Sequence, residues 1–421
     1  MSNHSSRSKD ILKSISSLFI RRSSDNNDSL PNPTLSYRES FPDEVLQRYN
    51  RNAVSNALVS ISKRDTESLS EQITSTVKKF VPVTLIIPAY NEESTIGMLL
   101  SNLIKQAVLP ERIIVVDDFS SDRTGEIAKQ FDGVTVARTP NNTGSKGHAL
   151  NYGLRHVDSK YTITMDADIT LEEDAIQKMV EFMELQQDVS VACSFVLPKR
   201  IKTIWEHSRT VEYLFSFAFY KNVQQLYHSI LIASGCFTIY KTQDLKSMGG
   251  WPTRTAAEDM DLTWLFYEKG KSVCYVKDAI CFAIEPENFH LMSKQLKRWN
   301  TGFHQVLQFR WKSMMKIPVL REFIISALID SFIGTFFYLF IIYLSISSGN
   351  PLKCLAFFAL DIILVAIPSL WMAIKIRKCR QLAKSFPRYL IVRYLNLFWF
   401  YYGFISVWIL KKTTLRFEKG H

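Results

Sequence analysis

The sequence feature that most constrains this chain is a set of long apolar runs in its last quarter. Residues 331–352 carry no formal charge, residues 354–374 carry a single acid, and residues 394–410 are uncharged and rich in aromatic side chains. A helix needs about 20 residues to cross a bilayer, so we predict about three transmembrane helices within residues 323–412, after an interfacial segment at residues 311–322. Core helices of a large soluble domain are the alternative, and the third run could instead lie in the interface or re-enter the membrane.

The positive charge of the chain lies in the same quarter. Residues 312–421 hold 15 Lys and Arg against 4 Asp and Glu, which leaves 36 residues of each sign in the rest and accounts for the net charge of +11. Proteins that bind nucleic acids usually concentrate positive charge on the folded domain that contacts phosphates. We therefore expect no nucleic-acid partner.

The same basic residues indicate an orientation in the membrane. Residues 375–388 separate the second and third runs, are rich in Lys and Arg, and read as a loop that the positive-inside rule places in the cytoplasm. The residues before 320 would then be cytoplasmic too, so we expect a multi-pass protein of the cell (inner) membrane, in contact with membrane lipid. The short basic tail at residues 413–421 would lie outside, which is a mild violation of the rule.

The N-terminal segment differs from the rest in composition. Residues 1–40 are rich in Ser, Asn and Asp, which predicts a disordered tail, and residues 41–80 are expected to form a helical lead-in. Within the tail, apolar residues recur at helical spacing between residues 11 and 19, which is typical of a short helix on an anionic membrane surface. A frayed helix docked on the main domain is the alternative. The six cysteines form no CxxC pair, so we expect free thiols in a reducing compartment.

From about residue 81 the pattern changes to short β-branched runs that alternate with helical periodicity. Residues 85–87, 113–116 and 161–165 read as buried strands, whereas residues 96–104 and 175–183 carry apolar side chains on one helical face. This alternation predicts an α/β fold with a mainly parallel sheet and helices on both faces.

Polar residues follow three of these predicted strands, at residues 88–92, 117–120 and 166–168. Ligands of parallel sheets bind where the strands end, so these segments mark the expected site. No GxGxxG follows the first strand, which argues against a dinucleotide-binding dehydrogenase. Carboxylates suit a phosphate-binding site only when a divalent cation intervenes, so the pattern predicts Mg²⁺ or Mn²⁺.

Six segments in this order resemble the inverting glycosyltransferases of family 2, which have the GT-A fold. The resemblance covers roughly residues 81–310 and includes the family's uridine-binding, DxD and QxxRW motifs. A single one of these motifs is weak, but several in order at suitable spacing are specific. The matching segments are PAYNE at 88–92, DDFS at 117–120, GSKGHALN at 144–151, DAD at 166–168, AED at 257–259 and QLKRW at 295–299.

The resemblance implies a role for each matched acid near the reacting atoms. Asp259 would be the base that deprotonates the acceptor hydroxyl, with Glu258 beside it, although an acid at a helix start is also favoured by the helix dipole. Asp168 would bind the Mg²⁺ or Mn²⁺ directly, and Asp166 would contact the metal or the ribose of the nucleotide.

The resemblance also implies which residues bind donor and acceptor. Lys146 and Arg298 would meet the donor diphosphate, and Asp118 would hydrogen-bond the uracil ring. Trp299 would stack against the acceptor sugar, with an interface anchor as its alternative role, and an ordinary loop lysine is the alternative for residue 146. The expected donor set is Tyr90, Glu92, Asp117, Asp118, Lys146, Asp166 and Arg298, and the expected acceptor set is Gly235, Gln295 and Trp299.

Three positions depart from the family pattern. Phe119 replaces a usual glycine, so the turn after Asp118 must differ or tolerate a bulky residue. Ala257 replaces a threonine and Leu296 a frequent arginine, which removes a hydroxyl and a cation but leaves the expected base in place.

Residues 281–299 look most like the poly-N-acetylglucosamine, chitin-oligosaccharide and hyaluronan synthases of that family. The resemblance therefore implies a membrane-bound, processive transferase that adds a sugar, N-acetylglucosamine first among the candidates, from a UDP-sugar donor to a growing polysaccharide. The alternatives are single addition to a lipid-linked (polyprenyl-phosphate) acceptor and an inactive nucleotide-sugar sensor. A pore for the product would require a homodimer or an accessory secretion subunit.

Overall fold

The computed structural model describes residues 79–227, 230–350, 352–375 and 379–412. The expectations for the tail at 1–40 and for the basic tail at 413–421 lie outside the described residues. The same is true of the helical lead-in, apart from residues 79–80, which form the start of a strand.

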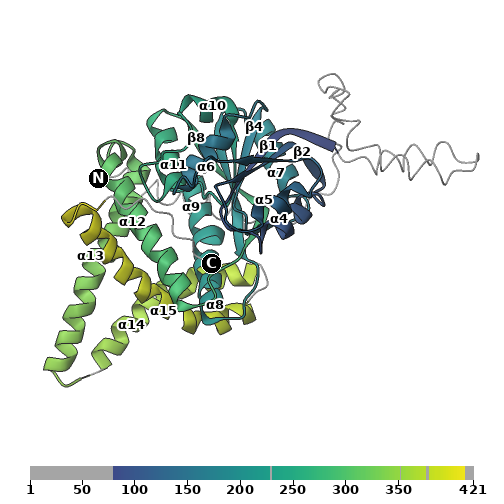
Figure 1. Ribbon diagram of the computed structural model, residues 1–421. Coiled ribbons are helices and arrows are strands. Elements are labelled where there is room, and N and C mark those ends of the chain that lie inside the picture. The colour runs from purple at the N-terminus through teal and green to yellow at the C-terminus, as the bar shows by residue number, and fades with distance from the viewer. Residues whose placement is uncertain (1–78, 228–229, 351, 376–378, 413–421) are drawn as a thin grey trace, which may run out of the picture. The chain divides into compact units, whose positions relative to one another are not determined.

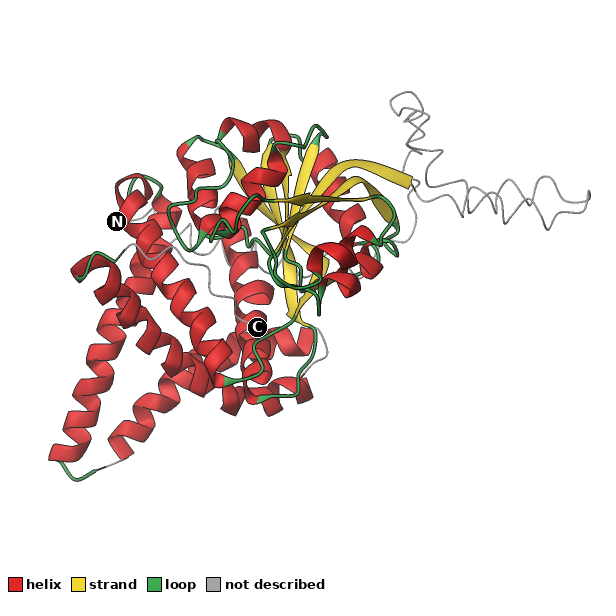
Figure 2. Cartoon of the chain, in the orientation of Figure 1, coloured by secondary structure: helices red, strands yellow, loops and turns green. Residues whose placement is uncertain are grey.

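Within the described ranges, eight strands form one sheet in the order β3-β2-β1-β4-β7-β6-β8-β5 (Figure 2). Strands β3, β2, β1 and β4 are parallel, as predicted, but β7 is antiparallel to both of its neighbours, β4 and β6. The α/β class and the mainly parallel sheet are confirmed: β6 and β8 also pair in parallel, and only β7 and β5 run against the other strands of the described sheet. The strands are β1 Lys79–Ala89, β2 Val108–Asp117, β3 Val134–Arg138, β4 Tyr161–Met165, β5 Ile169–Leu171, β6 Val189–Pro198, β7 Phe237–Lys241 and β8 Ser272–Ala283.

Helices pack on the sheet through the apolar faces that the sequence predicts. Leu85, Ile86 and Ile87 of β1 have no exposed surface, which explains why this strand is a continuous apolar run rather than an alternating one. The two predicted helical faces are buried in α4 and α7, except for Ile104, which follows α4 and is 45 % exposed. The helices of this part are α4 Ile96–Leu103, α5 Thr124–Lys129, α6 Lys146–Leu154, α7 Ala175–Leu185, α8 Ile204–Tyr213, the π-helix Leu214–Tyr220, α9 Lys221–Leu226, α10 Thr242–Ser247 and α11 Glu258–Glu268.

Four longer helices follow the sheet. They are α12 Phe289–Met314, α13 Pro318–Ser347, α14 Leu352–Lys375 and α15 Cys379–Phe404, which continues as a π-helix over Ile405–Ile409. Figure 1 shows α13 and α14 as neighbouring helices joined by a short turn. The boundary predicted at residue 310 falls inside α12, because that helix continues to Met314 before Pro318 starts the next one.

The three predicted transmembrane runs fall on α13, α14 and α15. Of the helices in the described part of the chain, one, Cys379–Ile409, is long and apolar enough to cross a membrane by length and composition. Shorter apolar stretches cover Tyr338–Ser347 and Val365–Lys375. A C-terminal helix suited to a membrane is therefore present, and the multi-pass arrangement stays a prediction.

The basic segment before the third run was expected to be a loop, and this expectation is wrong for residues 379–388. These residues form the first half of α15, because Lys and Arg are good helix formers and because this half packs on α8. His207 Nδ1 lies 2.8 Å from Ser385 Oγ, and Ser208 Oγ donates to the backbone oxygen of Arg388 at 2.7 Å.

The second half of α15 packs closely on α12. Asn300 Nδ2 donates to Asn396 Oδ1 at 2.8 Å, and a ring nitrogen of His304 lies 3.1 Å from the backbone oxygen of Phe400. At Gly403 the two backbones approach so closely that a Cβ atom would lie 2.9 Å from the Asn300 oxygen. The apolar C-terminal helix is thus packed directly against the helix that carries the 295–299 motif.

Candidate active site

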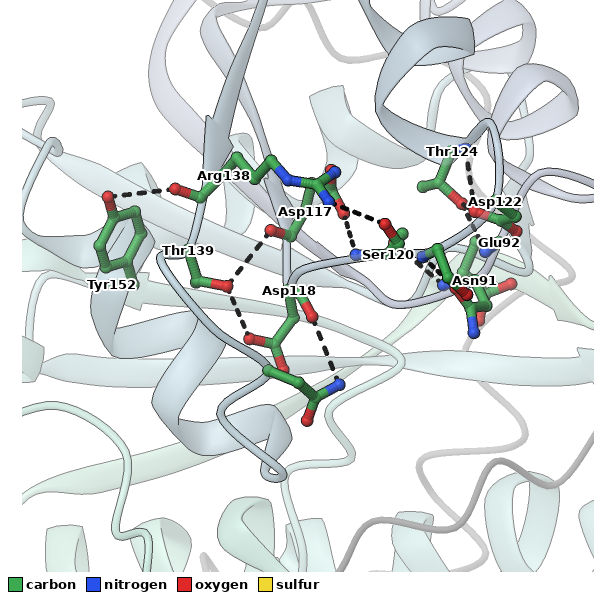
Figure 3. A network of polar contacts seen from close by, with 12 residues as sticks. Asn91, Glu92, Asp117, Asp118, Ser120, Asp122, Thr124, Arg138, Thr139 and Tyr152 are labelled. Carbon is green, nitrogen blue, oxygen red and sulfur yellow. Dashed lines mark hydrogen bonds and ion pairs between the residues drawn. The ribbon is translucent and has the colours of Figure 1, made fainter.

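The candidate site lies where β1, β2 and β4 end. These strands are parallel and in register, so Ala89 at the end of β1 lies opposite Asp117 at the end of β2, and the loops that follow meet at one edge. Figure 3 shows the resulting network of polar side chains. The sheet therefore brings together the segments after the first two predicted strands.

The loop after β1 is tied to the loop after β2 by hydroxyl groups. The backbone N–H of Asn91 donates to Ser120 Oγ at 3.0 Å, and that of Glu92 donates to Thr124 Oγ1 at 2.7 Å (Figure 3). The buried Glu92 carboxylate accepts from Thr95 Oγ1 at 2.6 Å. Glu92 thus fixes the start of α4. From the sequence alone, this structural role could not be distinguished from the expected role in donor binding.

Asp117 and Asp118 are buried and bind to protein groups on opposite sides of the turn. Asp117 accepts from Arg138 Nη1 at 2.5 Å and from the backbone N–H of Ser120 at 2.9 Å. Asp118 accepts from Thr139 Oγ1 at 3.0 Å (Figure 3). It also accepts from the hydroxyl of Thr143 at 2.8 Å. Asp118 therefore holds the segment that leads into α6 and Lys146.

Phe119 keeps the backbone conformation that a glycine would adopt. Its φ angle is +61°, in the left-handed region where a Cβ atom is unfavourable. The ring is 48 % exposed, and the Arg138 guanidinium lies 5.0 Å from its centre. The turn thus accommodates the bulky residue with its ring directed partly to solvent. Tyr90, at the end of β1, is also exposed.

Lys146, the first residue of α6, joins three of the other predicted segments. Its Nζ atom lies 2.5 Å from Asp166 Oδ1, 3.7 Å from Glu258 Oε1 and 3.5 Å from the Gly235 backbone oxygen. Burial alone would lower its pKa, but the carboxylates of Asp166 and Glu258 raise the pKa above its ordinary value. Lys146 is therefore a permanent cation at the centre of the site.

Asp259 lies at the start of α11 with its carboxylate held by backbone groups. Oδ2 accepts from the N–H of Gly235 at 3.0 Å, and Oδ1 accepts from the N–H of Met260 at 2.8 Å. A Cβ atom at residue 235 would lie 2.9 Å from Lys146 Nζ, so a larger residue there would displace the Lys146 ammonium group from its present position. Burial raises the pKa of the neighbouring Glu258. The positive charges of Lys146 and Arg298 lower this pKa but do not cancel the effect of burial.

Asn151 fixes the loop that precedes Asp259. Its Nδ2 donates to the Trp251 oxygen at 2.7 Å, and its Oδ1 accepts from the Trp251 N–H at 2.8 Å. Gly250 has φ +80°, and a Cβ atom there would lie 2.1 Å from Asn151 Oδ1. The role of Asn151, the last residue of the 144–151 segment, is thus to bind the backbone of Trp251 on the other side of the site.

A buried ion-pair cluster joins α11 to α12. Asp261 has no exposed surface and accepts from Arg254 at 3.0 and 3.1 Å and from Arg310 Nε. Gln305 Oε1 accepts from the backbone N–H of Ala256 at 2.8 Å. The helix with the expected base and the helix with the expected acceptor residues are therefore held together.

Two of the expected acceptor residues, Gln295 and Trp299, lie on the first half of α12 together with Arg298 of the expected donor set. Gln295 and Arg298 are half-buried, and Trp299 is 39 % exposed. Beside them lies Arg209 of α8, whose guanidinium carbon is 4.5 Å from the centre of the Trp299 ring. No motif pointed to Arg209, because it belongs to a helix without a family signature.

The predicted metal ligands offer the right chemistry but an incomplete set. Asp166 and Asp168 are half-buried and flank the buried Ala167. Within the described ranges, no group of three or more His, Cys, Asp or Glu side chains is placed to hold a metal ion. The two carboxylates fit Mg²⁺ or Mn²⁺ if the oxygens of a bound diphosphate complete the shell.

Comparison with known proteins agrees with this geometry. Residues 84–249 match the family model described as glycosyl transferase family 2. The chain is 28 % identical over 252 residues to a poly-beta-1,6-N-acetyl-D-glucosamine synthase of Staphylococcus aureus (strain COL), covering 59 % of this chain and 61 % of the relative. It is 29 % identical over 247 residues to the synthase of the same name from Staphylococcus epidermidis, covering 58 % and 60 %. The match thus spans about three fifths of the length of these curated relatives.

A solved structure supports the fold. A mannosyltransferase from Pyrobaculum calidifontis, in complex with GDP-Man and Mn²⁺, superimposes with a TM-score of 0.52 at 17 % identity. The superposition covers 87 % of this chain and 99 % of that one. The predicted GT-A fold is confirmed.

Proposed function

We propose that this protein is a membrane-bound inverting N-acetylglucosaminyltransferase, because residues 84–249 match the family model described as glycosyl transferase family 2. In this proposal it transfers the sugar from UDP-N-acetylglucosamine to a growing polysaccharide. The names of the Staphylococcus relatives support the donor and the polymeric product.

The observation that carries the proposal is the contact between Lys146 and Asp166, with Glu258 and Gly235 beside it. Gly235 in turn donates to Asp259. The cation suited to a diphosphate is thus one backbone amide away from the carboxylate suited to deprotonate an acceptor. An inverting transfer requires both groups at one sugar carbon.

Asp259 accepts the proton in the proposed reaction. The acceptor oxygen forms a bond to the anomeric carbon of the donor sugar, the bond from that carbon to the diphosphate breaks, and UDP leaves. The proton of the acceptor hydroxyl moves to the Asp259 carboxylate, which the N–H groups of Gly235 and Met260 hold in one orientation. Attack on the side opposite the departing UDP inverts the configuration at the carbon.

The negative charge of the departing diphosphate needs nearby cations. Asp166 and Asp168 would hold Mg²⁺ or Mn²⁺, which neutralises phosphate charge when bound. Lys146 supplies a second positive charge at the same place, since the carboxylates around it keep it protonated. In this proposal Arg298, whose charge already acts on Glu258, supplies a third.

We also propose the finer features of the membrane part. The chain would be multi-pass, with the transferase domain in the cytoplasm, and the close contact between α12 and α15 supports a site next to the bilayer. Because three helices are few to surround a polymer, export of the product would require a second copy of the chain or an accessory secretion subunit.

The test is a donor screen with the full chain in detergent. UDP-N-acetylglucosamine, UDP-glucose and UDP-galactose, each radiolabelled, are supplied with Mg²⁺ or Mn²⁺, and the products are sized. We expect a ladder of products from UDP-N-acetylglucosamine alone. A product with a single sugar added to lipid would show that the enzyme makes single additions and no polymer. Incorporation of sugar only from UDP-glucose or UDP-galactose would refute the proposed donor.

A further inference from the structure

Arg209 is a fully buried cation next to the expected acceptor residues. It lies on α8, where a capping box between Thr203 and Glu206 fixes the start of the helix. Its side chain has no exposed surface. An ionised guanidinium in such a place is strongly unfavourable unless its charge and its hydrogen bonds are satisfied, so its partners are informative.

Each edge of the Arg209 guanidinium faces a different partner. Nη1 donates to Glu212, and Nη2 donates to the side-chain oxygen of Gln295. Nε lies 3.3 Å from Glu285 Oε2, and the hydroxyl of Tyr213 donates to the other oxygen of Glu285. The partners come from α8, from α12 and from the segment after β8, so the cation connects three separate parts of the chain.

The contact with Arg209 determines how the Gln295 amide is turned. A guanidinium donates hydrogen bonds and accepts none, so Gln295 must direct its carbonyl oxygen at Arg209. Its NH₂ group then points away from the cation and is available as a donor. Sugar hydroxyl and N-acetyl oxygens are acceptors that such a donor can bind.

The same cation covers one face of the Trp299 ring. The guanidinium carbon lies 4.5 Å from the ring centre, within the range of a cation–π contact. Trp299 nevertheless keeps 39 % of its surface exposed. The cation thus contacts the ring while part of the residue stays accessible to a ligand.

We propose that Arg209 is a positioning residue for the acceptor. It fixes the Gln295 amide as a donor and holds the Trp299 ring ready to stack against a sugar of the growing chain. This inference rests on the proposed function and deepens it, because it names the residue that determines acceptor binding without touching the reacting atoms. Lysine cannot replace it, because a single ammonium group cannot make these contacts together.

The test separates acceptor binding from donor use. Full-length protein in detergent is titrated with a β-1,6-linked N-acetylglucosamine oligomer by calorimetry, and the KM for UDP-N-acetylglucosamine is measured in parallel. The variants are R209K, R209M and Q295E, which keeps an oxygen for Arg209 but loses the NH₂ donor. R200K is the matched control, since Arg200 pairs with Glu206 at 2.6 Å near the start of α8 instead of contacting the α12 residues.

We expect R209K and Q295E to bind the oligomer about tenfold more weakly, and R209M more weakly still, with the donor KM within about twofold of the parent. R200K should keep both constants within about twofold. Parent-like oligomer binding by R209K would overturn the inference, as would an equal loss of donor and oligomer affinity. If the parent protein binds the oligomer but transfers no sugar, the proposed function is refuted. The inference about Arg209 is still tested in that case, because oligomer binding is compared between parent and variants.

Discussion

The donor side and the acceptor side of the site are held by different kinds of contact. On the donor side, the carboxylates of Asp117 and Asp118 accept mainly from Ser and Thr hydroxyls and from backbone N–H groups of nearby loops, with one added ion pair between Arg138 and Asp117. On the acceptor side, long charged side chains reach between helices, as Arg209 does to Gln295 over a sequence separation of 86 residues.

This difference indicates what each side is sensitive to. The donor side depends on where strands end, which the sheet determines, so most single contacts there should be replaceable. The acceptor side depends on buried ions that balance one another, where loss of one partner leaves an unpaired charge. The following predictions test this contrast, starting with the group that both sides share.

Asp259 faces both sides, so its loss should have the largest effect. Asp259→Asn preserves size and an oxygen for the Gly235 N–H but removes the base, and we expect kcat to fall about a thousandfold. The measurement is sugar transfer, with UDP affinity expected to stay near that of the parent. Asp158→Asn, at a 91 % exposed side chain, is the control. Full turnover by Asp259→Asn would show that another group is the base.

Asp261 tests the buried ions of the acceptor side. Asp261→Asn leaves Arg254 and Arg310 without their shared carboxylate, and we expect a loss of about 3 kcal/mol in the free energy of unfolding. Denaturant titration measures this change. Glu184→Gln breaks the more exposed pair with Lys160 and should cost under about 1 kcal/mol. Equal losses of unfolding free energy in the two variants would show that the buried ion pairs of the acceptor side are no more sensitive than an exposed pair.

Glu285 predicts a pH dependence on the acceptor side. Burial raises the pKa of Glu285 from 4.5 to about 7, so between these values the folded protein holds a proton that the unfolded chain has lost. Stability should therefore fall as pH rises from 4.5 to 7, by about 2 kcal/mol from this group. Unfolding measured at both pH values should show a smaller fall in Glu285→Gln. An identical pH profile in the variant would contradict the assignment.

Phe119 tests the tolerance of the donor side and should have the smallest effect. Its left-handed backbone is unfavourable for a side chain, so Phe119→Gly should leave stability within about 1 kcal/mol, because relief of strain offsets the lost ring contact and the greater freedom of glycine when unfolded. Phe119→Val should cost about 1–2 kcal/mol, since a β-branched residue is worse at this φ. Thermal unfolding of both variants measures these changes. A valine variant more stable than the parent would show that the backbone at residue 119 is not strained.

Much of the donor side could be predicted from the sequence, because its strands, helices and strand-end acids are encoded by short stretches of neighbouring residues. The strand at 85–87, the helical face at 175–183 and the acids after the strands follow from periodicity and from the ends of parallel strands. The structure brings Lys146, Asp166, Glu258 and Asp259 together as the motifs implied. Their chemical roles remain predictions.

The rest could not be predicted because it depends on packing between distant elements. Arg209 has no motif, and its partners become visible only when α8 and α12 meet. The charge of residues 379–388 predicts on which side of a membrane they lie but not their conformation. They are helical in the structure and pack on α8. The antiparallel course of β7 likewise follows from its pairing with β4 and β6, which no local pattern encodes.

The missing side chain at Gly403 has a mechanical consequence. A Cβ atom there would lie 2.9 Å from the Asn300 oxygen, and the Asn300–Asn396 hydrogen bond lies two helical turns away on the same seam. A shift of α15 along α12 would disturb this close backbone contact and the Asn300–Asn396 hydrogen bond together. We therefore expect α12, which carries Trp299, and the apolar helix α15 to move as one unit.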